Sequence, residues 1–221
     1  MQSYAKNVSM TVVRRLPKYY QYLKDLEDRG VEKISSKELA SLMGLTASQI
    51  RQDLNSFGAY GQQGYGYRVL ELKEAIKQIL GLSATYDCIL IGGGNIGQAL
   101  AKYNHYRKDG ILINAIFDVD PEEVARKTDI AAYGMDGLED YVANNSVDIC
   151  ILAIPREAAQ NVADRVVKAG VRAILNFAPI DLDLPENVIV NNVSITDNFY
   201  TLTYLLAEDA MLKEQQKQKN T

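Results

Sequence analysis

The sequence predicts an α/β fold class: an N-terminal winged helix-turn-helix domain, a Rossmann-type doubly wound parallel sheet, and a C-terminal helix. Three observations carry this prediction. Two capping-box patterns start eleven residues apart, a Gly-x-Gly-x-x-Gly motif follows an apolar run, and apolar runs then alternate with helical patterns. We expect the three parts to span residues 1–83, 84–195 and 196–221.

The composition of the 221-residue chain is that of a globular protein, with 47% hydrophobic and 24% charged residues. The first ten residues, MQSYAKNVSM, lack the apolar core of a signal peptide, and no apolar run approaches the roughly 20 residues of a membrane helix. We therefore expect a cytoplasmic protein with no membrane segment. Cys88 and Cys150 lie in apolar runs and are expected to be inert core thiols; a thiol redox sensor is the alternative.

The charge of the chain, −4 overall, divides unevenly along its length. Residues 1–85 carry twelve Lys and Arg against eight Asp and Glu, whereas residues 86–221 carry twelve against twenty. A mildly basic region beside an acidic remainder favours an anion-binding module attached to a second domain. Because the excess of basic over acidic residues in residues 1–85 is small, an ordinary solvated surface is the alternative.

Helix-turn-helix organisation is predicted between residues 35 and 56. The segments SSKE and TASQ both have the capping-box pattern, and SLMGLT between them supplies a tight turn. Residues 47–56 would form the recognition helix, with Ile50, Leu54 and Phe57 on its core face. The side chains expected to meet base edges or phosphates are Ser48, Gln49, Arg51 and Gln52. A small helical dimerisation domain is the alternative.

The segment FGAYGQQGYGY, residues 57–67, predicts a wing directly after the recognition helix. Two short strands, residues 59–60 and 65–70, would be joined by a Gly-rich turn, and a helix over residues 71–82 would close the domain. Glycines let the backbone approach a phosphate chain or a narrow minor groove. The expected DNA contacts of the wing are Gln62, Gln63, Tyr65 and Tyr67. A flexible hinge is the alternative, although recurring aromatic residues are not typical of one.

A dinucleotide-binding motif opens the second region. The segment YDCILIGGGNIGQALAKY predicts a buried strand, a Gly-rich turn and a helix, and the next strand ends at Asp118, twenty-one residues after Gly97. Asp118 would accept hydrogen bonds from the adenosine ribose and repel a 2′-phosphate, so NAD(H) is favoured over NADP(H). The expected contacts on the phosphate side are Gly92, Gly94, Asn95, Ile96 and Gly97. Because Asp120 is placed to cap the next helix, Asp118 is left free for the ribose.

The remaining sequence continues the alternation of a doubly wound sheet. Strands are expected at AAYG, DICILAIP, RAILNFAP and NVIVNNV, with helices at GLEDYVANN and REAAQNVADRVVKAG. Ligands bind at the carboxyl ends of such strands. The further expected cofactor contacts are therefore Ala153, Ile154, Pro155, Asn176 and Phe177. Residues 196–221 predict a helix too apolar to stand alone in water, which must dock on its own chain or on a partner.

The pattern offers no catalytic equipment. The single histidine, His105, falls near the end of the first Rossmann helix, away from the expected nicotinamide position. No spacing of Cys, His or acidic residues matches a metal site or a triad. A cofactor-binding sheet fused to a winged helix therefore favours a sensor over an enzyme. The alternatives are a small NAD-dependent oxidoreductase with a helical accessory domain and a module for another nucleotide, such as coenzyme A.

Several separate segments resemble the Rex family of redox-sensing transcriptional repressors. They are RRLPKYYQYL, ISSKELASLMGLTASQIRQDL, FGAYGQQGYGY, GGGNIGQALAKY, FDVDP and NFAP, which are spread over nearly the whole chain. The resemblance implies a homodimer that binds operator double-stranded DNA with an AT-rich inverted repeat, and a C-terminal helix swapped into the partner. It also implies a repressor, not an enzyme, that NADH releases from DNA, whereas NAD⁺ is compatible with DNA binding.

The resemblance implies roles for individual residues as well. Arg14, Arg15 and Tyr103 match family segments and are expected in a relay between cofactor state and domain interface, with Tyr103 among the cofactor contacts. Ser194 stands where the family often has an aspartate of that relay, and Gln52 stands where a basic residue is frequent. These departures bear on the strength of the NADH response and on DNA affinity, respectively.

Overall fold

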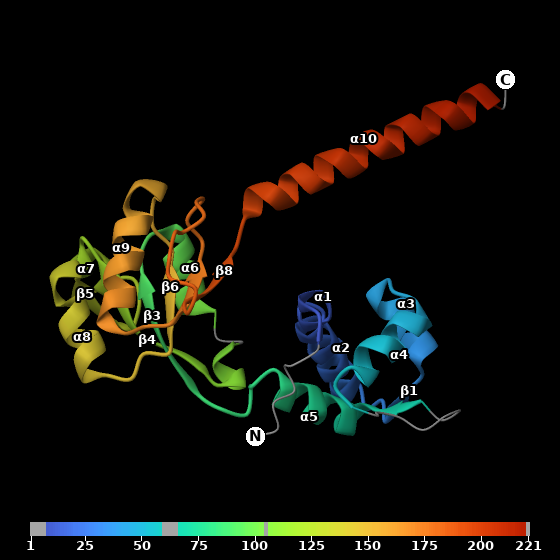
Figure 1. Cartoon of the computed structure of the whole chain (residues 1–221), viewed down its shortest axis with the longest axis horizontal. Helices are drawn as coiled ribbons and strands as arrows, with labels where there is room; N and C mark the ends of the chain where they lie inside the picture. The colour runs from blue at the N-terminus through green and yellow to red at the C-terminus, as the bar shows by residue number, and fades with distance from the viewer. Residues whose placement is uncertain (1–7, 59–65, 104–105, 220–221) are drawn as a thin grey trace. The chain divides into compact units, whose positions relative to one another are not determined.

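A computed structural model (Figure 1) describes residues 8–58, 66–103 and 106–219 of the chain. The chain folds as two compact units, Met1–Ala84 and Thr85–Thr221. Each unit has a buried apolar core of its own. The sequence predicts a different kind of site in each unit.

The first unit is built from short helices and one small sheet. Its helices are α1 (Met10–Val13), α2 (Leu16–Asp28), α3 (Ser36–Met43), α4 (Ala47–Asn55) and α5 (Val69–Ile79). Strand β1 (Lys33–Ile34) pairs antiparallel with β2 (Tyr67–Arg68). The core joins these helices through side chains such as Tyr19, Leu23, Ile50 and Ile76, all fully buried. The fold thus places α3 and α4 as the two helices of the predicted helix-turn-helix.

Capping explains why α3 and α4 begin where they do. The Ser35 hydroxyl accepts a hydrogen bond from the Glu38 amide at 3.1 Å, and the Glu38 carboxylate accepts one from the Ser35 amide at 2.8 Å. Thr46 and Gln49 repeat this arrangement at the start of α4. Each box satisfies amides that the first helical turn leaves without partners. Both predicted capping boxes are therefore confirmed.

The structure corrects the predicted wing. β2 covers only Tyr67–Arg68, and α5 begins at Val69 instead of residue 71, because Val69, Leu72 and Ile76 form a buried stripe at helical spacing. β2 pairs with β1, a strand of two residues that the sequence did not predict. The predicted strand at residues 59–60 and the tip residues Gln62, Gln63 and Tyr65 lie outside the described residues.

The second unit contains a six-stranded sheet whose described pairings are all parallel. The strands are β3 (Tyr86–Ile91), β4 (Ile111–Asp118), β5 (Ala131–Gly134), β6 (Ile149–Leu152), β7 (Ala173–Asn176) and β8 (Ile189–Asn192), in the order β5-β4-β3-β6-β7-β8. The chain winds outward from β3 in both directions, so the strand order reverses between β3 and β6. A crevice for ligands is expected at the carboxyl ends of these two strands. The predicted doubly wound sheet is confirmed.

Helices cover both faces of this sheet (Figure 1). α6 (Asn95–Lys102) and α7 (Pro121–Ala125) pack on the face with Leu90 and Ile116, and α8 (Leu138–Asn144) and α9 (Arg156–Ala169) pack on the face with Ile91 and Phe117.

Cys88 and Cys150 are free and buried. Burial raises the pKa of the Cys88 thiol to about 12 and also raises that of Cys150. Both cysteines therefore lie in the core, as predicted, and their raised pKa disfavours the reactive thiolate.

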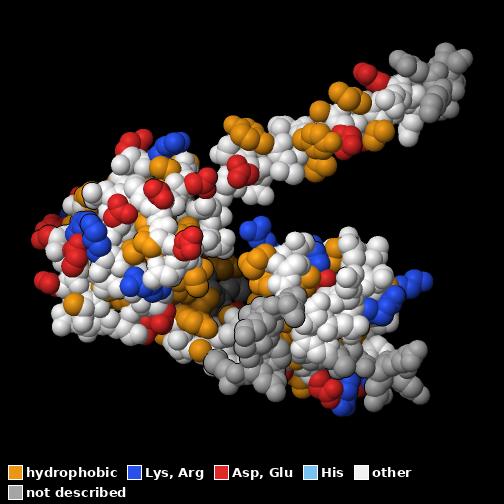
Figure 2. All heavy atoms as spheres, in the orientation of Figure 1, with side chains coloured by type: hydrophobic (Ala, Val, Ile, Leu, Met, Phe, Trp, Pro, Cys, Tyr) orange, Lys and Arg blue, Asp and Glu red, His pale blue; other side chains and the backbone are white. Residues whose placement is uncertain are grey.

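The last helix, α10, covers Ile195–Lys219. It begins one residue earlier than the predicted start at residue 196. The Ser194 hydroxyl caps it by accepting a hydrogen bond from the Asp197 amide at 3.1 Å. Figure 2 shows apolar side chains at the surface along this helix. Those exposed are Ile195, Phe199, Tyr200, Leu202, Tyr204, Leu205, Leu206, Met211 and Leu212. Among the helices in the described part of the chain, none is long and apolar enough to cross a bilayer.

Candidate nucleic-acid interface and nucleotide pocket

The recognition helix α4 has a buried face and a polar, exposed face. Ile50, Asp53 and Leu54 are buried. Exposed polar side chains recur at helical spacing on the opposite side, and they are Ser48, Gln49, Arg51, Gln52 and Asn55. The four α4 side chains that the sequence predicts to meet DNA therefore all lie on one surface of the unit.

Two of these four side chains already have partners within the unit. The Gln49 carbonyl accepts hydrogen bonds from the amide and the hydroxyl of Thr46, at 3.0 and 3.1 Å. Its amide group remains the part of the side chain that can donate to DNA. The Arg51 guanidinium donates to the Ser36 hydroxyl of α3 at 3.1 Å. A guanidinium has five N–H donors, so Arg51 can keep this contact and still meet a phosphate or a guanine edge.

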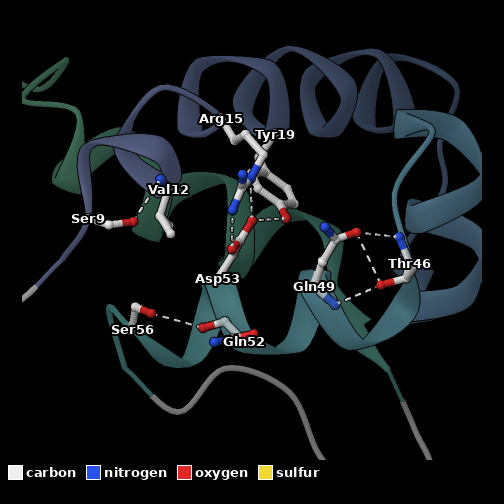
Figure 3. Close-up of polar contacts among 9 residues, drawn as sticks. All are labelled: Ser9, Val12, Arg15, Tyr19, Thr46, Gln49, Gln52, Asp53 and Ser56. Atoms are coloured by element: carbon white, nitrogen blue, oxygen red, sulfur yellow. Dashed lines mark hydrogen bonds and ion pairs between the residues drawn. The ribbon is translucent and has the colours of Figure 1, made fainter.

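A buried carboxylate connects α4 to α2 (Figure 3). Asp53 is 2% exposed and accepts hydrogen bonds at 2.7 Å from both Nε and Nη2 of Arg15. The Tyr19 hydroxyl donates to the same carboxylate at 2.9 Å. None of these three residues is among the predicted DNA contacts, and Arg15, which is expected in the relay between cofactor state and domain interface, pairs with Asp53 inside the first unit. The available signal was a charged residue between Ile50 and Phe57 on the core face of the helix.

The prediction that Tyr67 contacts DNA is wrong. Its side chain is 7% exposed and belongs to the core of the first unit. The same burial raises the pKa of its hydroxyl. The cause is the alternation along β2, which turns Tyr67 inward and its neighbour Arg68 outward. Arg68 is therefore the described residue of this strand that can face a polyanion.

The glycine motif forms a close turn between β3 and α6. Gly92 has a φ of +100°, and a Cβ there would collide with the Ala153 carbonyl. A Cβ on Gly97 would collide with the Gly92 carbonyl, so only glycine lets α6 lie this close to the strand. Nothing lies within 4 Å of a Cβ built on Gly94, which is exposed at the N-cap of α6. Open space there leaves the first amides of α6, at Asn95 and Ile96, accessible to an anion.

Asp118 lies at the carboxyl end of β4, beside this turn. Its Oδ2 accepts a hydrogen bond from the Gly93 amide at 2.6 Å, and its Oδ1 accepts one from the Asp120 amide at 2.9 Å. Asp120 caps α7 through the Glu123 amide at 3.0 Å, as expected. Asp118 is therefore not free of hydrogen bonds, but two backbone amides fix its position. A carboxylate has about four acceptor sites, so it retains capacity for hydroxyl donors from a ligand.

A cavity of about 270 Å³ adjoins the glycine turn and Asp118. Its walls are mostly apolar, as is usual for cofactor pockets. The lining residues are Ile91, Gly92, Gly94, Phe117, Asp118, Val119, Met135, Ala153, Ile154, Pro155, Ala158 and Val162. The structure thus brings together the glycine turn, Asp118 and the predicted segment 153–155 at the point where the strand order reverses.

Asn176 and Phe177 do not line this cavity. Asn176 is 0% exposed and uses its side chain internally. Its amide group donates to the Ile180 carbonyl and to Asn192, and its oxygen accepts from the Ala178 amide. The side chain therefore fixes the loop after β7 in place of the predicted cofactor contact. Phe177 packs against the core on the α6 side of the sheet.

Tyr103 also lies away from the cavity. It follows α6 at the C-terminal end, and the eight residues of the helix extend for about 12 Å. Tyr103 is not among the residues that line the cavity, and its contact with a cofactor stays a prediction. His105 lies outside the described residues. Within the described part of the chain, no three His, Cys, Asp or Glu side chains are grouped to hold a metal ion.

Two family models match separate parts of the chain. The model described as a DNA-binding protein N-terminus matches residues 7–55, and the model described as a CoA binding domain matches residues 83–180. The chain is 52% identical over 204 residues to "Redox-sensing transcriptional repressor Rex" of Clostridioides difficile, covering 92% of this chain and 97% of that one. It is 50% identical over 208 residues to the protein of that name from Caldanaerobacter subterraneus, covering 94% and 93%.

Solved structures match the whole architecture. The structure of RSP with beta-NAD⁺ and operator DNA is 47% identical, with a TM-score of 0.85 over 96% of this chain and 98% of that one. RSP with beta-NADH gives a TM-score of 0.86 at 46% identity, over 94% and 98%. A helix-turn-helix unit joined to a Rossmann unit defines a nucleotide-responsive class of transcription regulators. Within that class, the chain belongs to the Rex family of redox-sensing repressors.

The glycine turn predicts different costs for the same substitution at two positions. Gly97→Ala should lower the free energy of unfolding by about 3 kcal/mol, because the added Cβ meets a backbone carbonyl that cannot move aside. Gly94→Ala, where the Cβ enters open space, should cost less than about 1 kcal/mol. Urea denaturation of both variants measures the difference. Equal costs would contradict the close packing of α6 on β3.

Proposed function

We propose that this chain is a transcriptional repressor that binds operator DNA as a homodimer and is released by NADH. The observation that carries the proposal is the presence, in one chain, of an exposed polar recognition helix and of a cavity lined by the glycine turn and Asp118. The solved relatives of this architecture are complexes with NAD⁺ and operator DNA and with NADH. A repressor must share a compartment with its operator and with the NADH pool, which places its action in the cytoplasm.

The pocket favours NADH and NAD⁺ over related nucleotides. Asp118 is held by two amides at the position where an adenosine ribose would lie, beside the glycine turn. Its charge opposes the 2′-phosphate of NADP(H) and the 3′-phosphate of coenzyme A alike. The pyrophosphate would lie against Gly94 and the first amides of α6, as an anion at a helix N-terminus. Ala153, Ile154 and Pro155 would form the apolar wall toward the nicotinamide.

The DNA surface is the exposed face of α4 together with the wing. Ser48, Gln49, Arg51 and Gln52 would enter the major groove, with Arg51 as the only cation among them. A two-fold symmetric dimer requires an inverted-repeat operator, and contacts of the wing in the minor groove favour AT-rich sequence there. Gln62, Gln63 and Tyr65 remain the proposed wing contacts.

The homodimer is proposed to form through residues 196–221. Apolar side chains lie on most sides of α10, since Phe199, Tyr200 and Leu205 are separated by about 100° or more around the helix. A helix of this kind is buried on several sides when stable. Insertion into a second subunit would supply those surfaces, which supports a swapped helix.

NADH can release the operator only if it binds more tightly to the state with low DNA affinity. The coupling is reciprocal, so operator DNA must weaken NADH binding by the same factor. Ser194 lies at the start of α10 and caps it as well as an aspartate would. Serine in place of the aspartate that the family often has at position 194 thus keeps the start of α10. It also removes one negative charge from the proposed relay. A small oxidoreductase is the less favoured function, because the relatives are named transcriptional repressors.

Asp118→Asn should weaken NADH binding about tenfold, because a charge-assisted hydrogen bond to the ribose is replaced by a neutral one. The variant should also discriminate less between NADH and NADPH, since the repulsion of a 2′-phosphate is removed. Titration of nucleotide fluorescence measures both effects. Asp129→Asn, at an exposed position of the same unit, is the control with the same charge change. Unaltered discrimination would remove Asp118 from the ribose site.

Arg51→Ala should weaken operator binding about tenfold or more and leave NADH binding intact, because Arg51 is the cation of the exposed face of α4. Arg29→Ala removes the same charge from an exposed position at the end of α2 and should have little effect. Mobility-shift titration at one salt concentration compares the two variants. Equal effects would show that only net charge matters and would contradict the assignment of α4.

Leu202→Glu with Leu206→Glu should convert the dimer to a monomer at micromolar concentration, because both charges would be buried in the proposed interface. Gln215→Glu with Gln216→Glu adds the same charge to the same helix without removing apolar area. Sedimentation velocity of the two double variants measures their mass. A dimer that survives the leucine substitutions would contradict dimerisation through α10.

A further inference from the structure

Asp53 is the one charged residue buried among the described residues, and it lies on the helix assigned to DNA recognition. Asn176, in the other unit, is the only other buried polar residue of the described ranges. A carboxylate is seldom buried unless it is paired and hydrogen-bonded. The position of Asp53 therefore calls for a reason that the DNA-facing residues of α4 do not supply.

The Asp53 network, formed by Asp53, Arg15 and Tyr19, makes three contacts that join α4 to α2 and to Arg15, the N-cap residue of α2 (Figure 3). Arg15 meets both carboxylate oxygens at 2.7 Å, in a two-pronged arrangement. Tyr19, one turn further along α2, donates to Oδ2 at 2.9 Å. The carboxylate side chain is 3% exposed and that of Arg15 is 26% exposed. The hydrogen bond from Arg15 to Asp53 raises the pKa of Arg15. Burial, together with the hydrogen bond from Tyr19 to Asp53, raises the pKa of Tyr19.

Stability alone does not explain a buried ion pair at this position. Desolvation of two charges offsets much of their attraction, and apolar side chains of similar size often stabilise as well. Apolar packing, however, tolerates small rotations and shifts of one helix against another. A guanidinium fork and a phenol hydroxyl on one carboxylate accept only one relative arrangement of the two helices. The distinctive property of the Asp53 network is thus geometric.

The orientation of α4 affects the contacts with base edges, but not the general attraction to the phosphate backbone. Asp53 directly follows Arg51 and Gln52, so a rotation of the helix about its axis moves these side chains relative to base edges. Contacts to base edges need accurate placement, whereas attraction to the phosphate backbone does not. We infer that Asp53 is a positioning residue for sequence recognition, holding α4 on Arg15 and Tyr19 so that its exposed face meets the operator in one orientation. This inference rests on the proposed operator binding.

Charge and geometry predict opposite effects for Asp53→Asn. The substitution removes a negative charge and leaves Arg15 without its neutralising partner, so the attraction of the unit to any DNA should increase slightly. If the carboxylate positions α4, affinity for the operator should nevertheless fall. A loss of operator affinity with retained affinity for unrelated DNA therefore cannot arise from charge.

The test measures two dissociation constants for each protein by fluorescence anisotropy at one salt concentration. One duplex is the operator crystallised with RSP, and the other is a scrambled duplex of the same length and composition. For Asp53→Asn, we expect the operator constant to rise about tenfold while the scrambled constant changes by less than about twofold. Asp28→Asn removes the same charge from an exposed position of α2 and should change both constants in parallel, by less than about twofold. NADH affinity of both variants should equal that of the unsubstituted protein.

Tyr19→Phe keeps the ion pair and removes one contact, so it serves if Asp53→Asn is too unstable. We expect it to reduce the preference for the operator about threefold, with full folding at the assay temperature checked by circular dichroism. An unchanged ratio of the two constants in both variants would overturn the inference. A parallel loss on both duplexes would also overturn it, since that result indicates stability alone. If the unsubstituted protein does not distinguish the duplexes, the proposed operator binding itself fails.

Discussion

The apolar surface of α10 is the constraint on which the rest of the molecule depends. Nine large apolar side chains, from Ile195 to Leu212, stand exposed in the single chain. At roughly 25 cal/mol per Å² of apolar surface, leaving them in water is costly enough to require a covering surface. In the proposed homodimer, a second subunit would cover them and would bring two recognition helices together. Such a pairing would match an operator with an inverted repeat.

Two carboxylates illustrate how the chain fixes geometry in each unit. Asp53 is fully enclosed, and side chains from another helix satisfy it. Asp118 is partly exposed, and backbone amides of its own turn hold it. Asp53 is too deeply buried to meet a ligand and is inferred to position a helix, whereas Asp118 retains acceptor sites in the lining of a cavity. Burial and partner type thus distinguish the proposed positioning role of Asp53 from the proposed binding role of Asp118.

Local signals account for the part of the fold that was predictable. Capping boxes at Ser35 and Thr46, and glycines at close backbone approaches, act within a few residues and appear directly in the sequence. Contacts between segments that are far apart in the chain do not appear in the sequence in this way. Arg15 and Asp53 are 38 residues apart, and nothing in either segment names the other. Tyr67 was misassigned because its aromatic character suggested a contact with DNA, whereas the pairing of β2 with the short β1 turns it inward.

The most direct test of the account is the effect of the two nucleotides on one preformed complex. The protein is bound to a fluorescent AT-rich inverted-repeat duplex at fixed salt, and the anisotropy is followed as NADH, or in parallel NAD⁺, is added. The account predicts that NADH lowers the anisotropy to that of free DNA, while NAD⁺ at the same concentrations leaves the complex intact. An identical response to both nucleotides, or none to either, would contradict a repressor that senses the redox state of NAD.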